Sequence, residues 1–182
     1  TAGYQTGIIG KWHLGDYSSD PRYNPVRHGF DSYLGVPYSN DMWRQVRPDG
    51  HPPTRPPLPL LRDEEVIQQQ PDQASLTERY MEECVRFVRK HRGGPFFLYL
   101  AHMYVHVPLF VPHRFLRQAE NGGYGGAVEC IDWVAGVIFH ELRRQGLDDN
   151  TMVIFTSDNG SRARRGRQQR AAARHQVHDM GR

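Results

Sequence analysis

The sequence predicts an α/β fold with a mostly parallel sheet. Three short and almost continuously apolar segments, residues 6–10, 95–101 and 151–156, have the composition of strands that are buried on both faces. Two longer segments, about 75–91 and 124–145, carry apolar residues at helical spacing. The order strand, long connection, helix, strand, helix, strand favours right-handed crossovers that pack helices against the sheet.

The predicted helices have recognisable apolar faces and ends. In the first, Leu76, Tyr80 and Cys84 recur at helical spacing, and the glycines at 93–94 are expected to end it. In the second, Gly146 is the expected residue just past the C-terminus. Cys84 and Cys130 both fall in these helices, so we expect two buried core residues rather than a disulfide.

The connection from Gly15 to about Pro71 is too long for a simple loop. Five prolines between positions 52 and 59 make part of it polyproline-like and exposed. We therefore expect this segment to lie over a functional site rather than in the core.

The net charge of +3 is unevenly distributed. Residues 161–182 hold seven Arg and one Asp, which leaves 16 basic and 19 acidic side chains, or −3, in the rest. Only this tail suggests a nucleic-acid or membrane-surface partner, and we expect neither for the body. The chain has no run of 18 apolar residues, so we expect no membrane span. It begins at Thr1 rather than Met, so we expect it to be a piece of a longer protein.

Polar side chains follow the first two predicted strands. Lys11 and His13 come directly after the first strand, and His102 and His106 follow the second. If residues 11–13 are extended, Lys11 and His13 leave the backbone on the same side. Ligands gather at the carboxyl ends of parallel strands, so Lys11, His13 and His106 are expected to share one anion-binding site, with His102 as a candidate supporting residue in the same loop.

The third predicted strand is followed by Asp158 and Asn159. A carboxylate and an amide carbonyl are hard oxygen ligands, which suit Ca²⁺ or Mg²⁺. Asp-Asn-Gly is also a common turn, so this stretch alone leaves both interpretations open. A divalent cation, a lysine and histidines at one point suit hydrolysis of a sulfate or phosphate ester.

Four stretches resemble the type I sulfatases. Residues 3–15 match the pattern G-Y-x-T-x-x-x-G-K-W-H-L-G, and residues 29–42 resemble the arylsulfatase run G-F-x-x-F-L-G-x-P-Y-S-x-D. The others are P-F-F-L-Y followed by H-x-P, and F-T-x-D-N-G. The resemblance implies an alkaline-phosphatase-like α/β sandwich, here truncated at both ends. It also implies calcium-dependent hydrolysis of an aryl or sugar sulfate, with Ca²⁺ favoured over Mg²⁺, and a secreted, periplasmic or lysosomal location.

The resemblance also implies a role for individual residues. These roles are calcium ligation by Asp158 and Asn159, sulfate contact by Lys11, support of a formylglycine nucleophile by His13, contact near the leaving oxygen by His106, and lining of the substrate pocket by Ser39. The family's nucleophile motif, C-x-P-S-R, and its upstream aspartate pair are absent and are expected before Thr1. The fragment alone is therefore expected to be inactive.

Two other functions stay open at this point. One is a phosphomonoester or phosphonate hydrolase of the same superfold, and the other is a basic-tailed nucleic-acid-binding module without enzymatic activity. The missing nucleophile motif would separate the two hydrolases. The nucleic-acid interpretation requires the arginine-rich tail to be genuine.

The tail differs in character from the rest, so we divide the chain into a partial catalytic domain at 1–160 and a basic tail at 161–182. If the reading frame is shifted forward by one nucleotide, the codons of residues 168–182 can encode N-N-A-P-L-R-G-T-K-S-T-T-W-E-G. This sequence resembles a family segment whose lysine binds sulfate. We therefore predict a frameshift near residues 160–167 and a disordered tail.

Overall fold

The computed structural model describes residues 2–17, 19–45, 51, 53, 55–158 and 160. It forms two compact units, Thr1–Asn150 and Thr151–Arg182, and each is treated by itself below. The predicted tail, 161–182, lies outside the described residues.

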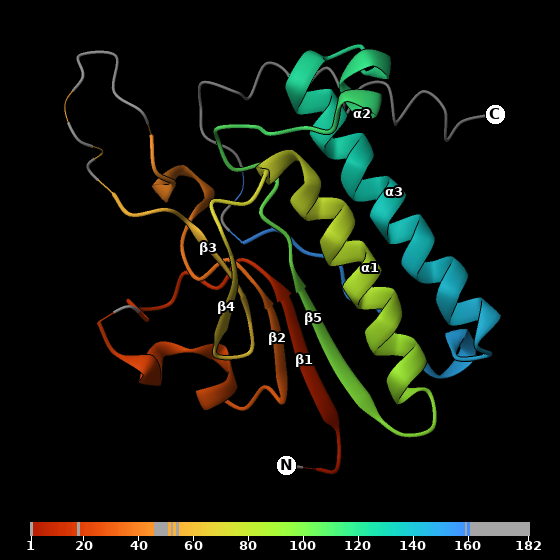
Figure 1. Ribbon diagram of the computed structural model, residues 1–182. Coiled ribbons are helices and arrows are strands. Elements are labelled where there is room, and N and C mark those ends of the chain that lie inside the picture. Colours follow the sequence, from red (N-terminus) through yellow and green to blue (C-terminus); the bar gives the residue numbers. More distant parts are fainter. Residues whose placement is uncertain are drawn as a thin grey trace. The chain divides into compact units, whose positions relative to one another are not determined.

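A five-stranded mixed sheet forms the centre of the first unit, as Figure 1 shows. Its strands are β1 (Gln5–Gly10), β2 (Ser32–Gly35), β3 (Pro59–Arg62), β4 (Glu65–Gln69) and β5 (Phe96–Ala101), in the order β4-β3-β2-β1-β5. Strand β1 pairs in parallel with β2 and β5, whereas β3 is antiparallel to both β2 and β4. The α/β class is confirmed, and the parallel part is β2-β1-β5.

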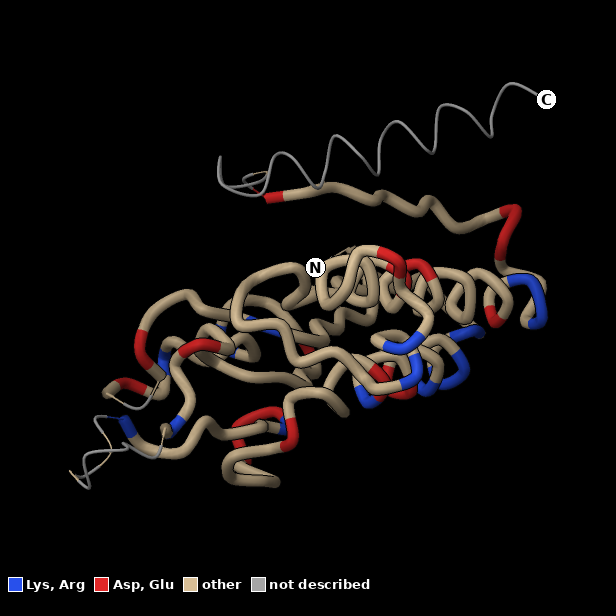
Figure 2. The backbone as a smooth tube through the Cα atoms, turned by 90° about the horizontal axis from the view of Figure 1, so that it is seen from above, with Lys and Arg blue, Asp and Glu red and all other residues tan. Residues whose placement is uncertain are grey.

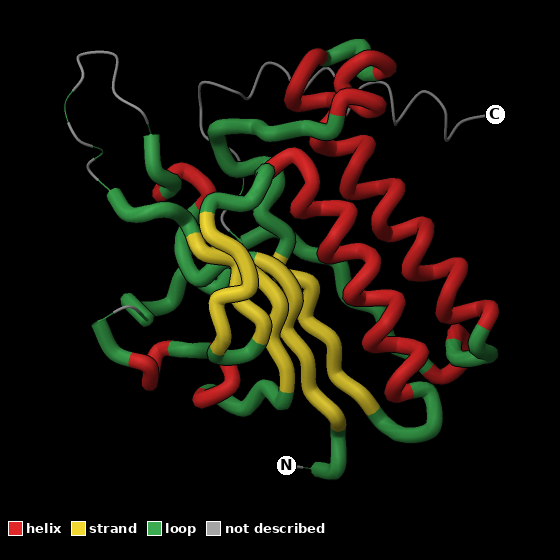
Figure 3. Tube along the Cα trace, in the orientation of Figure 1, coloured by secondary structure: helices red, strands yellow, loops and turns green. Residues whose placement is uncertain are grey.

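The described residues form three α-helices beside the sheet: α1 (Gln73–His91), α2 (His113–Gln118) and α3 (Gly122–Arg144). Helix α1 contacts β1, β2 and β5, α3 packs on α1, and α2 packs on α3, so the helices stack outward from the sheet (Figure 3). The sequence predicted α1 and α3 but not α2, which is only six residues long. Short 3-10 turns lie at Pro21–Tyr23, Pro25–Arg27, Asn40–Met42 (η3) and Asp148–Asn150.

Local sequence signals fix both long helices. The side chain of Asp72 accepts a hydrogen bond from the Ala74 N–H and caps α1. Gly146 has φ +66° just beyond α3, and the Leu147 N–H donates to the Leu142 carbonyl across it. This is the glycine-dependent helix end that the sequence predicted.

The long connection contributes to the core, contrary to the prediction. Strands β2, β3 and β4 all arise from it, and Val36, Leu58 and Leu60 within it are fully or almost fully buried. Pro59 begins β3 and is buried, although the proline-rich stretch was expected to be exposed. These strands are only four or five residues long, and the polar and proline-rich sequence between them hid their pattern.

The third predicted strand is also wrong in this structure. Residues 151–156, in the second unit, have no assigned strand. Met152 is 86% exposed and Phe155 is 81% exposed. An apolar run becomes a strand only when another strand satisfies its backbone N–H and C=O groups, and this segment forms no ladder with any described residue.

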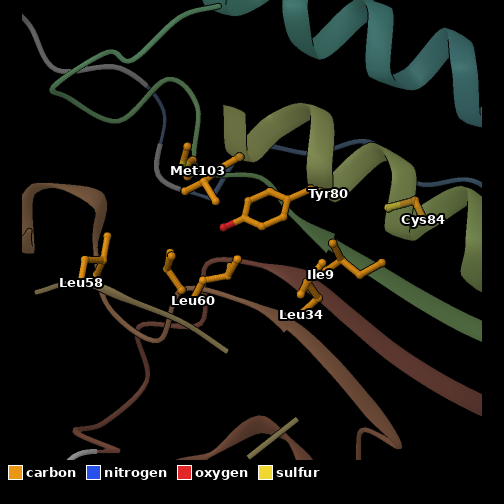
Figure 4. Close-up of a cluster of buried hydrophobic side chains, with 9 residues drawn as sticks. Ile9, Leu34, Leu58, Leu60, Tyr80, Cys84 and Met103 are labelled. Atoms are coloured by element: carbon orange, nitrogen blue, oxygen red, sulfur yellow. The ribbon is translucent and has the colours of Figure 1, made fainter. Parts of the chain in front are cut away.

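Alternating side chains of β1 divide the core between the two faces of the sheet. Ile9 packs with Leu34 and Leu60 beneath Tyr80 and Cys84 of α1, as the close-up in Figure 4 shows. Ile8 faces the other side with Tyr33, where Trp12 and Phe30 pack against them. Cys84 and Cys130 are free and buried, as the sequence predicted.

Acidic and basic residues are interspersed along the described chain, as Figure 2 shows. The Arg89 guanidinium binds both carboxylate oxygens of Glu141, at 2.7 and 2.9 Å, and so joins α1 to α3. None of the described helices has the length and apolar character to cross a bilayer.

Candidate functional site

The backbone that carries Lys11 and His13 is fixed on both sides. Beyond the end of β1, the Lys11 N–H donates to the Ala101 carbonyl at 2.8 Å, at the end of β5. The His13 N–H donates to the Pro37 carbonyl at 3.0 Å, in the segment that follows β2. Lys11 and His13 therefore lie where the parallel strands β1, β2 and β5 end. The sequence predicted the ends of β1 and β5 at this edge, whereas β2 takes a place that it did not predict.

Close backbone approach at this edge requires glycine at two positions. Gly10 has φ +122°, and a Cβ there would lie 2.0 Å from the Ala101 carbonyl oxygen. A Cβ on Gly35 would lie 1.7 Å from the Gly10 carbonyl oxygen. The absence of a Cβ at both positions lets the backbones of β1, β2 and β5 approach closely just before Lys11.

His13 does not continue the strand as expected. Its φ is +51°, a left-handed conformation, so residues 11–13 are not uniformly extended. Partial desolvation and the positive charge of Lys11 lower the pKa of His13, the charge of Asp41 raises it, and His106 lowers it further. Lys11, His106 and Asp41 therefore lie near enough for their charges to act on the His13 imidazole.

His106 lies in the segment after β5 and has a defined ring orientation. Its Nδ1 is 2.7 Å from the Val107 carbonyl oxygen, which can only accept, so Nδ1 carries the proton. In the neutral ring Nε2 is then the free acceptor, and in the imidazolium Nε2–H is a donor. A turn closed by the His106 N–H on the Met103 carbonyl holds the backbone.

His102 belongs to the interior of the same segment. Its Nδ1 accepts a hydrogen bond from the Tyr104 N–H at 3.1 Å, and its Nε2 is buried. Burial lowers the pKa of His102 to about 4, so the ring is neutral at ordinary pH. His102 therefore stabilises the loop that carries His106.

Asp41 is a member of the site that residue-by-residue sequence reasoning did not single out. The neighbouring Ser39 hydroxyl lowers the pKa of Asp41, and the charges of His106 and Arg55 lower it further. Ser39 is 3% exposed, and its Oγ has no hydrogen bond of good geometry among the described residues. Asp41 lies in the P-Y-S-N-D stretch, which was the available signal.

The profile of the family described as Sulfatase matches residues 1–179. The chain belongs to the sulfatase family. N-acetylgalactosamine-6-sulfatase of Rattus norvegicus is 36% identical over 177 residues, which cover 88% of this chain and 31% of that protein. The sulfatase chain described here thus spans under a third of the length of that relative.

Solved structures confirm the expected sulfatase fold. Ps i-CgsB in complex with k-i-k-neocarrahexaose has a TM-score of 0.62 and 28% identity, covering 81% of this chain and 36% of that one. PsFucS1 sulfatase from Pseudoalteromonas sp. has a TM-score of 0.70 at 24% identity, over 87% of this chain and 36% of that one. The latter likeness concerns the fold alone.

The predicted metal ligands of this sulfatase chain fall in the second unit. Asp158 is exposed, and Asn159 lies outside the described residues. Across the described ranges, no three His, Cys, Asp or Glu side chains gather in a metal-binding group. The assignment of Asp158 and Asn159 to calcium therefore stays a prediction.

Proposed function

We propose that this chain forms part of the active site of a sulfuric ester hydrolase. The observation that carries the proposal is the grouping of Lys11, His13 and His106 where β1 and β5 end. One lysine and two imidazoles around one point provide positive charge for a sulfate and groups that can move a proton. Membership of the sulfatase family supports the same reaction.

Each of the three side chains then has a distinct task. The Lys11 ammonium binds the sulfate oxygens and stabilises the negative charge that develops on them. His106, with Nδ1 committed to the Val107 carbonyl, directs Nε2 toward the leaving oxygen and protonates it. His13 hydrogen-bonds the attacking hydroxyl, and partial burial together with the charge of Lys11 lowers the pKa of its imidazole, which favours the neutral ring.

The donor set Asp158 and Asn159 fits a calcium ion, since a carboxylate and an amide carbonyl are oxygen ligands that Ca²⁺ accepts. When bound there, the ion would supply positive charge that stabilises anionic oxygens. Formylglycine is the nucleophile that the family resemblance leads us to expect. Neither group changes the tasks of Lys11, His13 and His106.

A sulfated sugar is the substrate class we favour. The relative at 36% identity is named for a sulfated amino sugar, and the structure at 28% identity contains a carrageenan oligosaccharide. Aryl sulfates are proposed as small test substrates. The likeness to these relatives also supports a lysosomal, secreted or periplasmic setting.

Hydrolysis of 4-nitrophenyl sulfate and 4-nitrophenyl phosphate by the whole protein tests the proposal. We expect the sulfate to be the better substrate, and Lys11→Ala or His106→Ala to reduce kcat/KM at least about a hundredfold. Lys90→Ala and His140→Ala, two exposed positions on the helices, are the matched controls and should change little. Faster hydrolysis of the phosphate would support the alternative hydrolase and contradict our proposal.

Calorimetric titration of the whole protein with Ca²⁺ tests the metal assignment separately. We expect Asp158→Ala to weaken binding strongly, because a carboxylate carries most of the attraction for a hard cation. Asp149→Ala, at an exposed aspartate outside the D-N-G stretch, should bind calcium normally. Unchanged calcium affinity in Asp158→Ala would remove this residue from the metal site.

A further inference from the structure

A buried amide connects the turn after β2 with the loop that carries His106. Asn40, at the start of η3, is 2% exposed. Its Nδ2 donates to the Pro108 carbonyl at 2.9 Å and reaches the His106 carbonyl at 3.5 Å. Both partners can only accept, so the orientation of the amide is fixed with its nitrogen toward the loop.

A second buried amide holds the first from the opposite side. Gln73, the first residue of α1, is 5% exposed, and its Nε2 donates to the Asn40 carbonyl at 3.0 Å. Helix α1 is 19 residues long and packs across the parallel strands, so Gln73 starts from a rigid support. The connection runs from α1 through Gln73 and Asn40 to the backbone at 106–108.

Both amides use their donor ends. The Oδ1 of Asn40 and the Oε1 of Gln73 are buried and have no hydrogen-bond partner among the described residues. Leaving such acceptors unpaired is costly, so two buried amides are a poor choice for packing alone. Their N–H groups instead donate to three backbone carbonyls, those of His106, Pro108 and Asn40.

We propose that Asn40 and Gln73 are positioning residues for His106. They fix the position and direction of the backbone at His106 relative to Lys11 and His13. In this way they place the Nε2 atom of His106 at the leaving oxygen. This inference rests on the proposed sulfate ester hydrolysis. Neither residue touches the substrate, and each acts through the carbonyl groups that it binds.

Variants that keep the shape but remove the donor provide the test. Gln73→Met keeps length and helix propensity and loses the Nε2–H, whereas Asn40→Asp keeps the size and turns the donor into an acceptor. Gln69→Met on the exposed face of β4 and Asn150→Asp near the end of the first unit are matched controls. All four are made in the whole protein.

The first readout compares two substrates that differ in the leaving group. Phenyl sulfate releases a more basic phenolate than 4-nitrophenyl sulfate, so its hydrolysis depends more on the proton from His106. We expect Gln73→Met and Asn40→Asp to reduce kcat/KM at least about tenfold on phenyl sulfate and about threefold or less on 4-nitrophenyl sulfate. Equal losses on both substrates would indicate general destabilisation and overturn the proposal.

The second readout does not need activity. Hydrogen exchange of amides 102–110 should be faster in Gln73→Met and Asn40→Asp than in the wild type, with no change in the two controls. Unchanged exchange in both variants would overturn the proposed connection. If the wild type hydrolyses no sulfate ester, the proposed function is contradicted independently of this inference. The hydrogen-exchange rates then test by themselves whether Asn40 and Gln73 hold the loop.

Discussion

The pKa of the His13 imidazole depends on each of its charged neighbours. Lys11 lowers its pKa and Asp41 raises it, with partial desolvation as the largest effect. Lys11→Ala should therefore raise the pKa of His13 toward 6.5, because a positive neighbour disfavours the imidazolium. Asp41→Asn should lower it, because a negative neighbour favours the imidazolium. An NMR titration of the His13 ring measures both shifts, and shifts of the same sign would contradict the arrangement.

Gly10 is the residue on which the convergence of β1 and β5 depends. Gly10→Ala should lower the free energy of unfolding by at least about 2 kcal/mol, since its φ is unfavourable for a side chain and its Cβ would clash with backbone. Gly136→Ala is the matched control, because nothing lies within 4 Å of a Cβ there and the residue is in α3. It should stabilise the protein by about 0.5–1 kcal/mol in urea unfolding.

A Gly10→Ala variant that is as stable as the wild type would show that the strands do not approach as described. The sequence identified Lys11, His13 and His106 at this edge because each follows an apolar strand. It could not give the left-handed backbone of His13 or the burial of Asn40 and Gln73. The His13 N–H is bonded to Pro37, and the contacts of Asn40 and Gln73 join residues 33 or more positions apart, so these features depend on distant parts of the sequence.

At the scale of elements, the Arg89–Glu141 pair fastens α3 to α1. The hydrogen bonds from Arg89 lower the pKa of Glu141 from 4.5 to about 2, although burial opposes this. The depressed pKa adds stability that is fully present above pH 4.5 and is lost as the pH falls through about 2. Glu141→Gln should therefore melt several degrees lower at pH 7, with a difference that shrinks as the pH falls from 4.5 to 2.

Differential scanning calorimetry between pH 7 and pH 2 measures that difference. Glu82→Gln, at an exposed position of α1, should melt like the wild type throughout. A difference for Glu141→Gln that is independent of pH would contradict an ionic origin.

Element by element, the two long helices and the parallel strands β1 and β5 were predictable. Their apolar spacing is regular and their ends carry glycine signals. The three strands in the long connection were not predictable, since each is four or five residues long and two of them are antiparallel additions to the sheet. Short strands are specified by their neighbours more than by their own sequence.

For the whole molecule, the first unit combines the sulfatase class of fold with a candidate site at the ends of its parallel strands. The likeness to solved sulfatase structures covers 81% or more of the chain for Ps i-CgsB and PsFucS1. The predicted strand at 151–156 shows the limit of pattern reasoning, because an apolar run does not provide the strand that must lie beside it. The proposed division into 1–160 and a frameshifted tail stays a prediction.

The central claim is that Lys11 and His106 act on one substrate in one site. A double-mutant cycle in the whole protein, measured as kcat/KM on 4-nitrophenyl sulfate, tests it most directly. If the claim is correct, Lys11→Ala and His106→Ala each cost at least about a hundredfold, and the double variant loses far less than the product of the two. Losses that multiply as for independent residues, or the absence of a loss in either variant, would contradict it.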